Sequence, residues 1–259
     1  MLSAIDRAWR LLATGFSFLT FGVGGILLWA IGLPLLFVLF PQPARRQKAA
    51  RRLIHRLFWL FLRMMRLLGV LRFEVVGAGR LKRPGLVIAA NHPTLLDVVF
   101  LLSMVPDATC IVRAGLADNP FTRAAVRSAG YVCNDWGVEL VDACVQALGG
   151  GSSLIVFPEG TRSNASRPQK WHRGAANIAL RTGISLTPVT IACEPPSLRK
   201  GEPWWHIPRR RMHYSIRVLD DVPVGRDSSR WESDVQAARG LTCELQELLT
   251  ERVERNAGA

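Results

Sequence analysis

The sequence predicts an α/β fold with a mixed, largely parallel sheet flanked by helices and an N-terminal membrane-embedded, amphipathic helical segment. From Arg72 onward, short apolar runs alternate with segments of helical periodicity, which is typical of strands and helices that follow one another. Before Arg72, the excess apolar content lies in one uncharged run. We therefore expect a membrane anchor in residues 1–43, a basic amphipathic helix in residues 44–71 and a globular domain in residues 72–259.

Composition and charge limit the classes of partner. Hydrophobic residues make up 49% of the 259 residues, which is high for a soluble domain and indicates contact with lipid. Lys and Arg outnumber Asp and Glu by 33 to 20, so we expect an anionic partner, either a membrane surface or nucleic acid. The five cysteines lie far apart without metal-ligand spacing, so we expect reduced thiols facing the cytoplasm and no metal site.

Residues 11–40 contain no charged residue, and this run exceeds the roughly 20 residues that a helix needs to span a bilayer. The run is long enough for one crossing of the bilayer and too short for two. Gly24, Gly25, Gly32 and Pro34 interrupt the run, so a bent or re-entrant element is an alternative to a straight span. A cleaved signal peptide is disfavoured, because its apolar region is typically about 7–15 residues and no cleavage site stands out.

The segment 44–71 combines basic residues with helical apolar spacing. The basic residues that follow the apolar run are Arg45, Arg46, Lys48, Arg51 and Arg52. Apolar residues recur at Leu53, Leu57, Leu60, Phe61, Met64, Leu68 and Leu71. This pattern predicts a basic helix lying in the membrane surface, with its flank and the globular domain on the cytoplasmic face of the inner membrane. The alternative is a core helix with a solvated basic face.

The globular domain should contain the following elements. Expected strands are residues 72–76, 85–90, 109–113, 131–134, 153–157, 186–191 and 213–219. Expected helices are residues 93–104, 120–129, 137–148 and 173–182. A closing helix over residues 229–255 should bury one apolar face, made of Trp231, Val235, Ala238, Leu241, Leu245 and Leu248. The sequence lacks G-x-S-x-G, P-loop, complete G-x-G-x-x-G and H-E-x-x-H motifs, so serine hydrolases, nucleotide-dependent enzymes and zinc proteases lack their simplest support.

The stretch "AANHPTLLDVVF", residues 89–100, places polar groups among apolar residues at the carboxyl end of an expected strand. Pro93 is expected to start the next helix, where its missing N–H costs nothing, with Asp97 about a turn and a half inside it. The Asp97 carboxylate could then fold back onto His92, fix the tautomer and raise the basicity of the other ring nitrogen, as a general base requires. The alternative is that Asn91 and His92 only cap the helix, while Asp97 favours its dipole.

A second polar turn, "PEGTRS" in residues 158–163, follows another expected strand. Gly160 permits close approach of the backbone, Thr161 offers a hydroxyl, and Arg162 presents a fork suited to phosphate or carboxylate. Glu159 is expected to orient Arg162 or to hold an acceptor hydroxyl. The alternative is a surface turn in which a Glu–Arg pair contributes little.

The two motifs together resemble those of a known family. "NHPTLLD", residues 91–97, followed by "FPEGTRS", residues 157–163, is similar to the first and third sequence blocks of the glycerolipid and lysophospholipid acyltransferases, the 1-acylglycerol-3-phosphate acyltransferase type. The strand "LTPVTI", residues 186–191, resembles their fourth block, with Pro188 at the expected place. The resemblance extends over residues 72–220.

The resemblance implies an acyltransferase catalytic domain with a C-terminal helix. It would move a fatty acyl group from acyl-CoA or acyl carrier protein to the hydroxyl of a lysophospholipid-like acceptor at the cytoplasmic membrane face. His92 would deprotonate the acceptor hydroxyl and Asp97 would orient His92, so that the alkoxide attacks the thioester directly. The residues implied in substrate binding are Asn91, Arg113, Glu159, Gly160, Thr161 and Arg162. No metal or cofactor is implied beyond the acyl donor.

The second block departs from the family pattern. Family members carry a Lys there and then a Gly-x-Ile-x-Arg-like run, whereas this chain has Arg113 and "GYVCNDW", residues 130–136. Asn134 and Asp135 stand where the phosphate-binding Arg is expected, so a phosphate would lose one partner and face a carboxylate. The acceptor could therefore be a lyso-aminolipid, another lysolipid, or a hydroxylated pigment or polyketide-like chain.

Two other function classes compete with acyl transfer. A non-catalytic lipid-binding protein on the same fold is supported by Asn134 and Asp135. A nucleic-acid binder is disfavoured, because the basic charge clusters beside the apolar anchor. The segment "EPWWHIPRRR", residues 202–211, pairs Trp204 and Trp205 with three arginines, as interfacial anchors do, although these tryptophans could equally pack inward. No local motif encodes the acyl chain length, the choice of donor or the oligomeric state.

Overall fold

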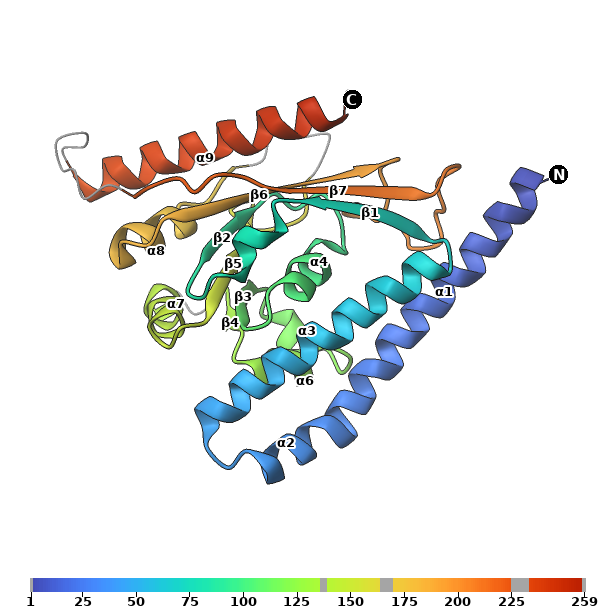
Figure 1. Cartoon of the computed structure of the whole chain (residues 1–259), viewed down its shortest axis with the longest axis horizontal. Helices are drawn as coiled ribbons and strands as arrows, with labels where there is room; N and C mark the ends of the chain where they lie inside the picture. Colours follow the sequence, from blue (N-terminus) through green and yellow to red (C-terminus); the bar gives the residue numbers. More distant parts are fainter. Residues whose placement is uncertain (1, 136–138, 164–169, 225–232, 258–259) are drawn as a thin grey trace.

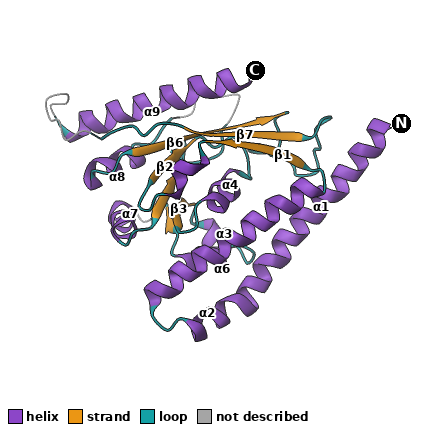
Figure 2. Ribbon diagram, viewed as in Figure 1, coloured by secondary structure: helices purple, strands orange, loops and turns teal. Residues whose placement is uncertain are grey.

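A seven-stranded sheet forms the centre of the computed structural model, with helices on both of its faces (Figures 1 and 2). The structure describes residues 2–135, 139–163, 170–224 and 233–257, with side chains described from residue 4 to residue 250 of these ranges. The strands are β1 (Leu71–Val76), β2 (Val87–Ala90), β3 (Ala108–Val112), β4 (Val132–Cys133), β5 (Ser153–Val156), β6 (Leu186–Glu194) and β7 (Met212–Val218). All seven predicted strands are therefore confirmed.

The strand order is β1-β7-β6-β2-β5-β3-β4. The β6–β7 pair is antiparallel and the other pairs are parallel, which confirms the prediction of a mixed, largely parallel sheet. β2, β5 and β3 lie next to one another and run in the same direction. The loops that leave their carboxyl ends therefore meet at one edge of the sheet, where α/β folds place their functional groups.

The N-terminal segment is a long helix that turns back on the domain. It consists of α1 (Leu2–Leu27), the π-helical turn η1 (Leu28–Gly32) and α2 (Leu33–Leu39), and α3 (Pro43–Leu67) runs back alongside it (Figure 1). The helix over residues 4–39 is long and apolar enough to cross a membrane, and an 18-residue window within it has a mean hydropathy of 2.3. Gly24 and Gly25 do not interrupt α1. The irregular turn lies before Pro34, because proline lacks the N–H and crowds the preceding turn of an α-helix.

Helix α3 packs partly as a core helix, which is the alternative interpretation of segment 44–71. Its buried residues are Ala50, Ile54, Leu62 and Met65. Its exposed large apolar residues are Leu57, Trp59, Leu60 and Leu67. Helix α3 thus joins the anchor to the domain on one side and presents apolar side chains on the other. The basic residues of α3 also divide between the buried and the exposed side. Arg52 is exposed, whereas the Arg51 side chain is only 10% exposed.

Arg51 ties α3 to three other segments. Its guanidinium donates to Asp107 Oδ1 at 2.6 Å, to the Ser152 hydroxyl at 2.9 Å and to the Ala129 carbonyl at 3.0 Å. We expect Arg51→Ala to lower the free energy of unfolding by about 2–4 kcal/mol, because a mostly buried carboxylate loses its closest cation and keeps only Lys48 at 3.4 Å and the Ser152 hydroxyl at 3.3 Å. Denaturant unfolding in detergent measures the change. Arg80→Ala is the control, since its partner Asp220 is 93% exposed and such pairs contribute at most about 1 kcal/mol. Equal losses in both variants would contradict the assignment.

The remaining helices cover the two faces of the sheet. They are η2 (a 3₁₀ turn, Ala78–Lys82), α4 (Asp97–Met104), α5 (Gly115–Asp118), α6 (Arg123–Ala129), α7 (Glu139–Gly149), α8 (Gly174–Thr182) and α9 (Asp234–Ala257). One apolar core packs α3, α4 and α6 on the sheet, and the other packs α7, α8 and α9 on its opposite face. Neighbouring residues Val87 and Ile88 of β2 belong to different cores, because both faces of the strand are buried.

The helix expected from Pro93 begins four residues later, at Asp97. The Asp97 carboxylate accepts hydrogen bonds from the Thr94 amide and the Thr94 hydroxyl, both at 2.6 Å. These bonds hold residues 93–96 in a non-helical turn, so the expectation that Asp97 lies a turn and a half inside the helix was wrong. Asp97 is instead the first residue of α4 and faces back toward the strand.

The buried face of α9 differs in part from the predicted one. Ala238, Leu241 and Leu245 are buried as expected, and Leu249 joins them. Val235 is 56% exposed, because the helix meets the rest of the molecule only from Ala237 onward. Leu248 is half-buried at the edge of this core. Trp231 and the first residues of the helix expected at 137–148 lie outside the described residues.

Candidate active site

A His–Asp pair lies at the carboxyl end of β2. His92 Nδ1 is 2.8 Å from Asp97 Oδ2. The Asp97 carboxylate is fully buried, and its two oxygens also accept the two hydrogen bonds from Thr94. A carboxylate in contact with Nδ1 favours the tautomer that carries its proton there, which leaves a lone pair on Nε2. The pairing expected from the sequence is present in the structure.

An aromatic neighbour restricts the orientation of the His92 imidazole ring. The rings of His92 and Phe157 stack with centroids 4.3 Å apart and an angle of 29° between their planes. The His92 side chain is 15% exposed, and within the described residues no hydrogen bond occupies Nε2. A small molecule that enters from the sheet edge would therefore meet the unprotonated nitrogen.

The second motif is bonded directly to the first. Glu159 is 5% exposed, and its carboxylate accepts the His92 amide at 2.8 Å and the Ser163 hydroxyl at 2.6 Å. The Ser163 amide in turn donates to the His92 carbonyl at 2.7 Å. Glu159 thus fixes the backbone of His92, whereas we had expected it to orient Arg162 or to hold an acceptor hydroxyl. The structure gives it a positioning role.

The turn that follows Glu159 combines a left-handed glycine with an anchored guanidinium. Gly160 has φ +66, and a Cβ atom there would lie 3.0 Å from the His172 ring, so the position requires glycine. Nη1 of Arg162 donates to the carbonyls of Leu198 and Arg199, each at 3.1 Å. A guanidinium has five N–H donors, so Nε and Nη2 can serve a ligand while Nη1 fixes the group. Thr161 is half-buried between the two.

The residues of the second block lie at the same edge of the sheet. Arg113 is exposed at the carboxyl end of β3, the strand next to β5. Asn134 and Asp135 are exposed at the end of β4, and Asn134 Oδ1 accepts the amide of Ala114 at 3.2 Å. The structure therefore places the two departures from the family pattern beside Arg113.

The Asn91 side chain is bonded to the neighbouring strand β6. Its side-chain Nδ2 donates to the Ile191 carbonyl at 2.8 Å, and its Oδ1 accepts the Ile191 amide at 2.7 Å. Asn91 is also buried. The side chain is engaged with β6 on both sides, so it positions the end of β2 in place of the predicted contact with substrate.

Two buried groups behind the His–Asp pair stay protonated at neutral pH. Burial raises the pKa of Tyr214 well above its usual value, and the Tyr214 hydroxyl donates to Thr94 Oγ1 at 3.1 Å. Burial also raises the pKa of the Cys193 thiol to about 12. Because only a thiolate is strongly nucleophilic, Cys193 is not a nucleophile at this site.

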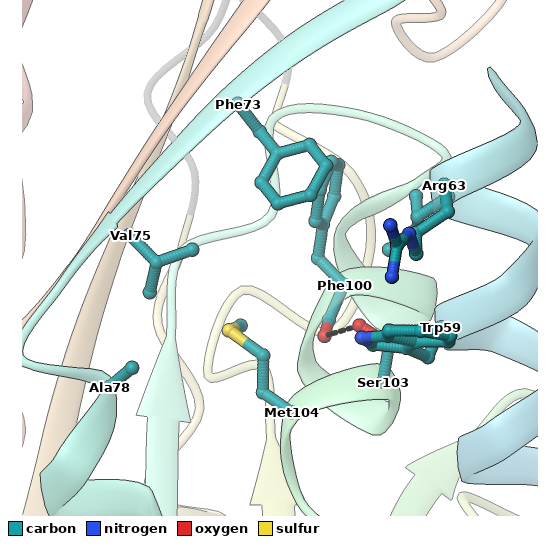
Figure 3. A pocket seen from close by; sticks show the side chains of 9 residues that line it. Trp59, Arg63, Phe73, Val75, Ala78, Phe100, Ser103 and Met104 are labelled. Carbon is teal, nitrogen blue, oxygen red and sulfur yellow. Dashed lines mark hydrogen bonds between the residues drawn. The ribbon is translucent and has the colours of Figure 1, made fainter. Parts of the chain in front are cut away.

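An apolar cavity of about 170 Å³ lies between α3, β1 and α4 (Figure 3). It is lined by Trp59, Leu62, Arg63, Phe73, Val75, Ala78, Phe100, Ser103 and Met104. The Ser103 hydroxyl is turned onto the Phe100 carbonyl at 2.7 Å, so it presents no free donor to the cavity. Helix α4 links this cavity to the His–Asp pair, because Asp97 begins the helix and three lining residues follow on it.

Three residues of the site were not singled out from the sequence: Thr94, Ser163 and Tyr214. Thr94 and Ser163 lie within the quoted motifs, and their hydroxyls were the available signal. Tyr214 is 120 residues from its partner Thr94. The only signal for Tyr214 was a tyrosine on the buried face of a strand, whose hydroxyl usually needs a partner.

Comparison with known proteins points to one family. Residues 72–192 match the sequence profile of the family described as Acyltransferase. The chloroplast 1-acyl-sn-glycerol-3-phosphate acyltransferase of Arabidopsis thaliana is 31% identical over 110 residues, which are 40% of this chain and 31% of that protein. The lyso-ornithine lipid O-acyltransferase of Pseudomonas aeruginosa is 28% identical over 133 residues, 50% of this chain and 51% of that protein. The chain thus spans only about a third to a half of these relatives.

The fold also matches a solved structure along its whole length. The crystal structure of the 1-acyl-sn-glycerophosphate acyltransferase PlsC of Thermotoga maritima gives a TM-score of 0.72 at 19% sequence identity, covering 99% of this chain and 98% of that one. At this identity the likeness concerns the fold, and it includes the N-terminal helices as well as the sheet.

Proposed function

We propose, from the match of residues 72–192 to the acyltransferase family, that the protein transfers a fatty acyl group to the hydroxyl of a lysophospholipid-like acceptor. The acyl donor is a thioester, acyl-CoA or acyl carrier protein. The reaction takes place at the cytoplasmic face of the inner membrane. The observation that carries the proposal is the His92–Asp97 pair, which Glu159 ties to the turn that carries Arg162.

The geometry suits direct transfer without a covalent enzyme intermediate. Nε2 of His92 takes the proton of the acceptor hydroxyl, and the oxygen forms a bond to the thioester carbonyl carbon. The C–S bond then breaks, and the thiolate leaves with the proton from His92. Asp97 stabilises the imidazolium that exists between these two steps. A positioned general base of this kind typically contributes about 10²–10⁴ in rate.

The acceptor head group and the acyl chain have separate candidate sites. Arg162 and Arg113 offer cations at the sheet edge for an anionic head group, and Gly160 lets it approach the backbone. The apolar cavity along α4 suits methylene groups of the acyl chain. In another protein, a dry apolar cavity of about 150 Å³ binds a molecule of the size of benzene. No metal or redox group takes part in this scheme.

A second candidate acceptor is a lysolipid without a phosphate, such as a lyso-aminolipid. Asp135 and Asn134 stand beside Arg113, where a carboxylate would repel a phosphate and attract an ammonium group. One relative is a lyso-ornithine lipid O-acyltransferase, whose acceptor carries an amine. The two acceptor classes differ in head-group charge, so a direct assay separates them.

A panel assay tests the function. Purified protein in detergent is incubated with acyl-CoA or acyl carrier protein thioester and, in turn, with lysophosphatidic acid, another lysophospholipid and lyso-ornithine lipid. Mass spectrometry then identifies any acylated product. Transfer to a lysophospholipid supports the first candidate, and exclusive transfer to lyso-ornithine lipid supports the second. No transfer to any acceptor from either donor would reject acyl transfer in favour of a non-catalytic lipid-binding protein.

The N-terminal helices attach the protein to the membrane by one face. Arg10 of α1 donates to the carbonyls of Pro208 and Arg209 at 2.8 and 2.9 Å, and a side chain at Gly25 would overlap the Phe121 carbonyl. The opposite face exposes Ile5, Leu12, Phe16, Leu19, Val23 and Ile26. A helix fixed to the domain at both ends in this way cannot cross a bilayer alone. We therefore favour the in-plane or re-entrant alternative over a straight span.

The tryptophan-rich segment continues this surface. Trp204 packs on Phe18 of α1 with ring centroids 5.5 Å apart, while Trp205 is 61% exposed. Trp204 is still 38% exposed beside Phe18, so both tryptophans are available to the membrane interface. Together with the apolar face of α1 they form what we call the lipid-facing surface.

Charge placed on this surface should release the protein from membranes. We expect Leu12→Glu combined with Leu19→Glu to lower partitioning into vesicles by about 100-fold or more, since each buried leucine contributes roughly 1.5–3 kcal/mol. Flotation on a density gradient measures the bound fraction. Val76→Glu is the control, because Val76 is 54% exposed on β1, outside that surface. Equal loss of binding in the control would contradict the assignment.

A further inference from the structure

Tyr214 lies behind the His–Asp pair, on the middle of β7. It is fully buried, and its ring packs on Phe100 with centroids 4.7 Å apart. Its neighbours across the sheet are Phe73 on β1 and Cys193 on β6. A phenylalanine would fill this space equally well, so packing alone does not account for a hydroxyl in an apolar core, where it costs free energy unless it is bonded.

The hydroxyl of Tyr214 is bonded, and the direction of the bond is fixed. It donates to Thr94 Oγ1 at 3.1 Å, and Thr94 Oγ1 also accepts the Leu96 amide at 3.2 Å. A hydroxyl has one donor and two acceptor positions. Both acceptor positions of Thr94 are therefore filled, and its single proton points at Asp97 Oδ1, 2.6 Å away. Tyr214, Thr94, Asp97 and His92 thus form one directed chain of hydrogen bonds.

We propose that Tyr214 is a positioning residue for the general base, acting through Thr94 on the carboxylate that holds His92. The proposal rests on the proposed acyl transfer. A donor on Thr94 Oγ1 polarises its O–H group and strengthens the bond to Asp97, as in other chains of hydrogen bonds inside proteins. The donor also prevents the Thr94 hydroxyl from rotating its proton away from Asp97. Burial keeps Tyr214 protonated, so it has a proton to donate, and the Cys193 thiol is a second neighbour of the same hydroxyl.

The chain supplies its own control for this hypothesis. It has two tyrosines, and the other one, Tyr131, is also buried. Within the described residues the Tyr131 hydroxyl has no hydrogen-bond partner. Tyr131→Phe and Tyr214→Phe therefore remove the same atom from two buried rings, and only the second removes a contact with the site.

Steady-state kinetics of the full chain in detergent test the proposal. Tyr214→Phe should lower kcat about five- to tenfold, the effect of one lost hydrogen bond, with KM unchanged. Tyr131→Phe should leave kcat at the wild-type value. Thr94→Val should lower kcat about 100-fold, and Thr94→Ser should restore most of it. In the Thr94→Val background, Tyr214→Phe should have no further effect, because the hydroxyl that it acts on is gone.

A second measurement does not depend on turnover. The His92 Nδ1 proton, held by Asp97, is followed by proton–nitrogen NMR of the same variants. Tyr214→Phe should shift this resonance and Tyr131→Phe should not. An unchanged resonance, or a shifted one with unchanged kcat, overturns the positioning role. If Thr94→Val fails to fold, the comparison of the two tyrosine variants decides alone. If the wild type transfers no acyl group, acyl transfer is rejected while the NMR comparison still tests the chain.

Discussion

Replacing His92 with alanine should lower kcat for acyl transfer by about 10²–10⁴-fold, the contribution of a positioned general base. Nε2 of His92 is the basic atom that the Asp97 carboxylate orients, and Glu159 ties the His92 backbone to the turn that carries Arg162. Without Nε2, the acceptor hydroxyl keeps its proton and attacks the thioester weakly. Initial rates with the acyl donor and lysolipid found in the panel assay measure the effect.

The control for His92→Ala is another histidine to alanine change, at a side chain on the opposite face of β7 from Tyr214. His213 on β7 is partly exposed and lies 3.7 Å from Glu74, so His213→Ala should keep full activity. Both variants should float with vesicles and melt near the wild-type temperature. If His92→Ala retained wild-type turnover, the proton would have to be removed by another group, and the assigned mechanism would be wrong.

The sheet was predictable because its strands are short apolar runs separated by helical segments. β2 and β5 each lie between two cores, and their short, nearly continuous apolar runs are typical of parallel strands that are buried on both faces. The start of α4 was predicted wrongly for a local reason. Proline usually opens a helix, but here the Asp97 carboxylate competes for the Thr94 amide and keeps the turn open. Propensity rules do not count such side-chain competition.

The two motifs of the site could be predicted from the sequence, but the contacts that their residues make could not. Both motifs follow parallel strands, so their proximity at one edge follows from topology. The role of Glu159 required coordinates, because its partner is the backbone amide of His92, 67 residues away. The hydrogen bonds of Asn91 required the structure for the same reason, since its partner Ile191 belongs to β6. Side chains that bind main-chain atoms of other strands leave no signature in sequence.

The N-terminal segment shows what hydropathy can and cannot decide. The uncharged run correctly predicted an apolar helix of sufficient length to meet lipid. Its orientation depends on contacts that are not apolar, such as Arg10 with the carbonyls of Pro208 and Arg209. From the sequence, Gly25 was expected to interrupt the helix. In the structure Gly25 allows the helix to approach the Phe121 carbonyl closely.

These contacts explain how His92 is kept rigid at the end of its strand. Its backbone is fixed by Glu159 and Ser163 from the β5 side, and the preceding Asn91 is fixed by β6. Its ring is fixed by Phe157 and Asp97. A base held from both neighbouring strands keeps its geometry without support from substrate, as catalytic groups require. The loss of Asp97 should therefore affect chemistry more than placement of the backbone.

Asp97→Asn should lower kcat by about 10²–10³-fold, within the range of general-base effects, and leave KM within about twofold. The asparagine can keep its oxygen toward His92 Nδ1 and the Thr94 amide only by turning its NH₂ group toward Thr94 Oγ1. Both acceptor positions of that hydroxyl are already filled, by Tyr214 and the Leu96 amide. The amide group is thus left without an acceptor, and it carries no charge to stabilise the imidazolium.

Asp97→Asn should also lower the free energy of unfolding. This measurement helps to separate a structural role of Asp97 from a catalytic one. A buried, unsatisfied NH₂ group costs about 1–3 kcal/mol, which denaturant unfolding can measure. Asp220→Asn is the control, since that carboxylate is 93% exposed, and it should change neither kcat nor stability. If Asp97→Asn lost stability but kept kcat, Asp97 would only satisfy buried donors. If it lost kcat with KM intact, the negative charge behind His92 is what the reaction uses, because the hydrogen bond to Nδ1 survives the substitution.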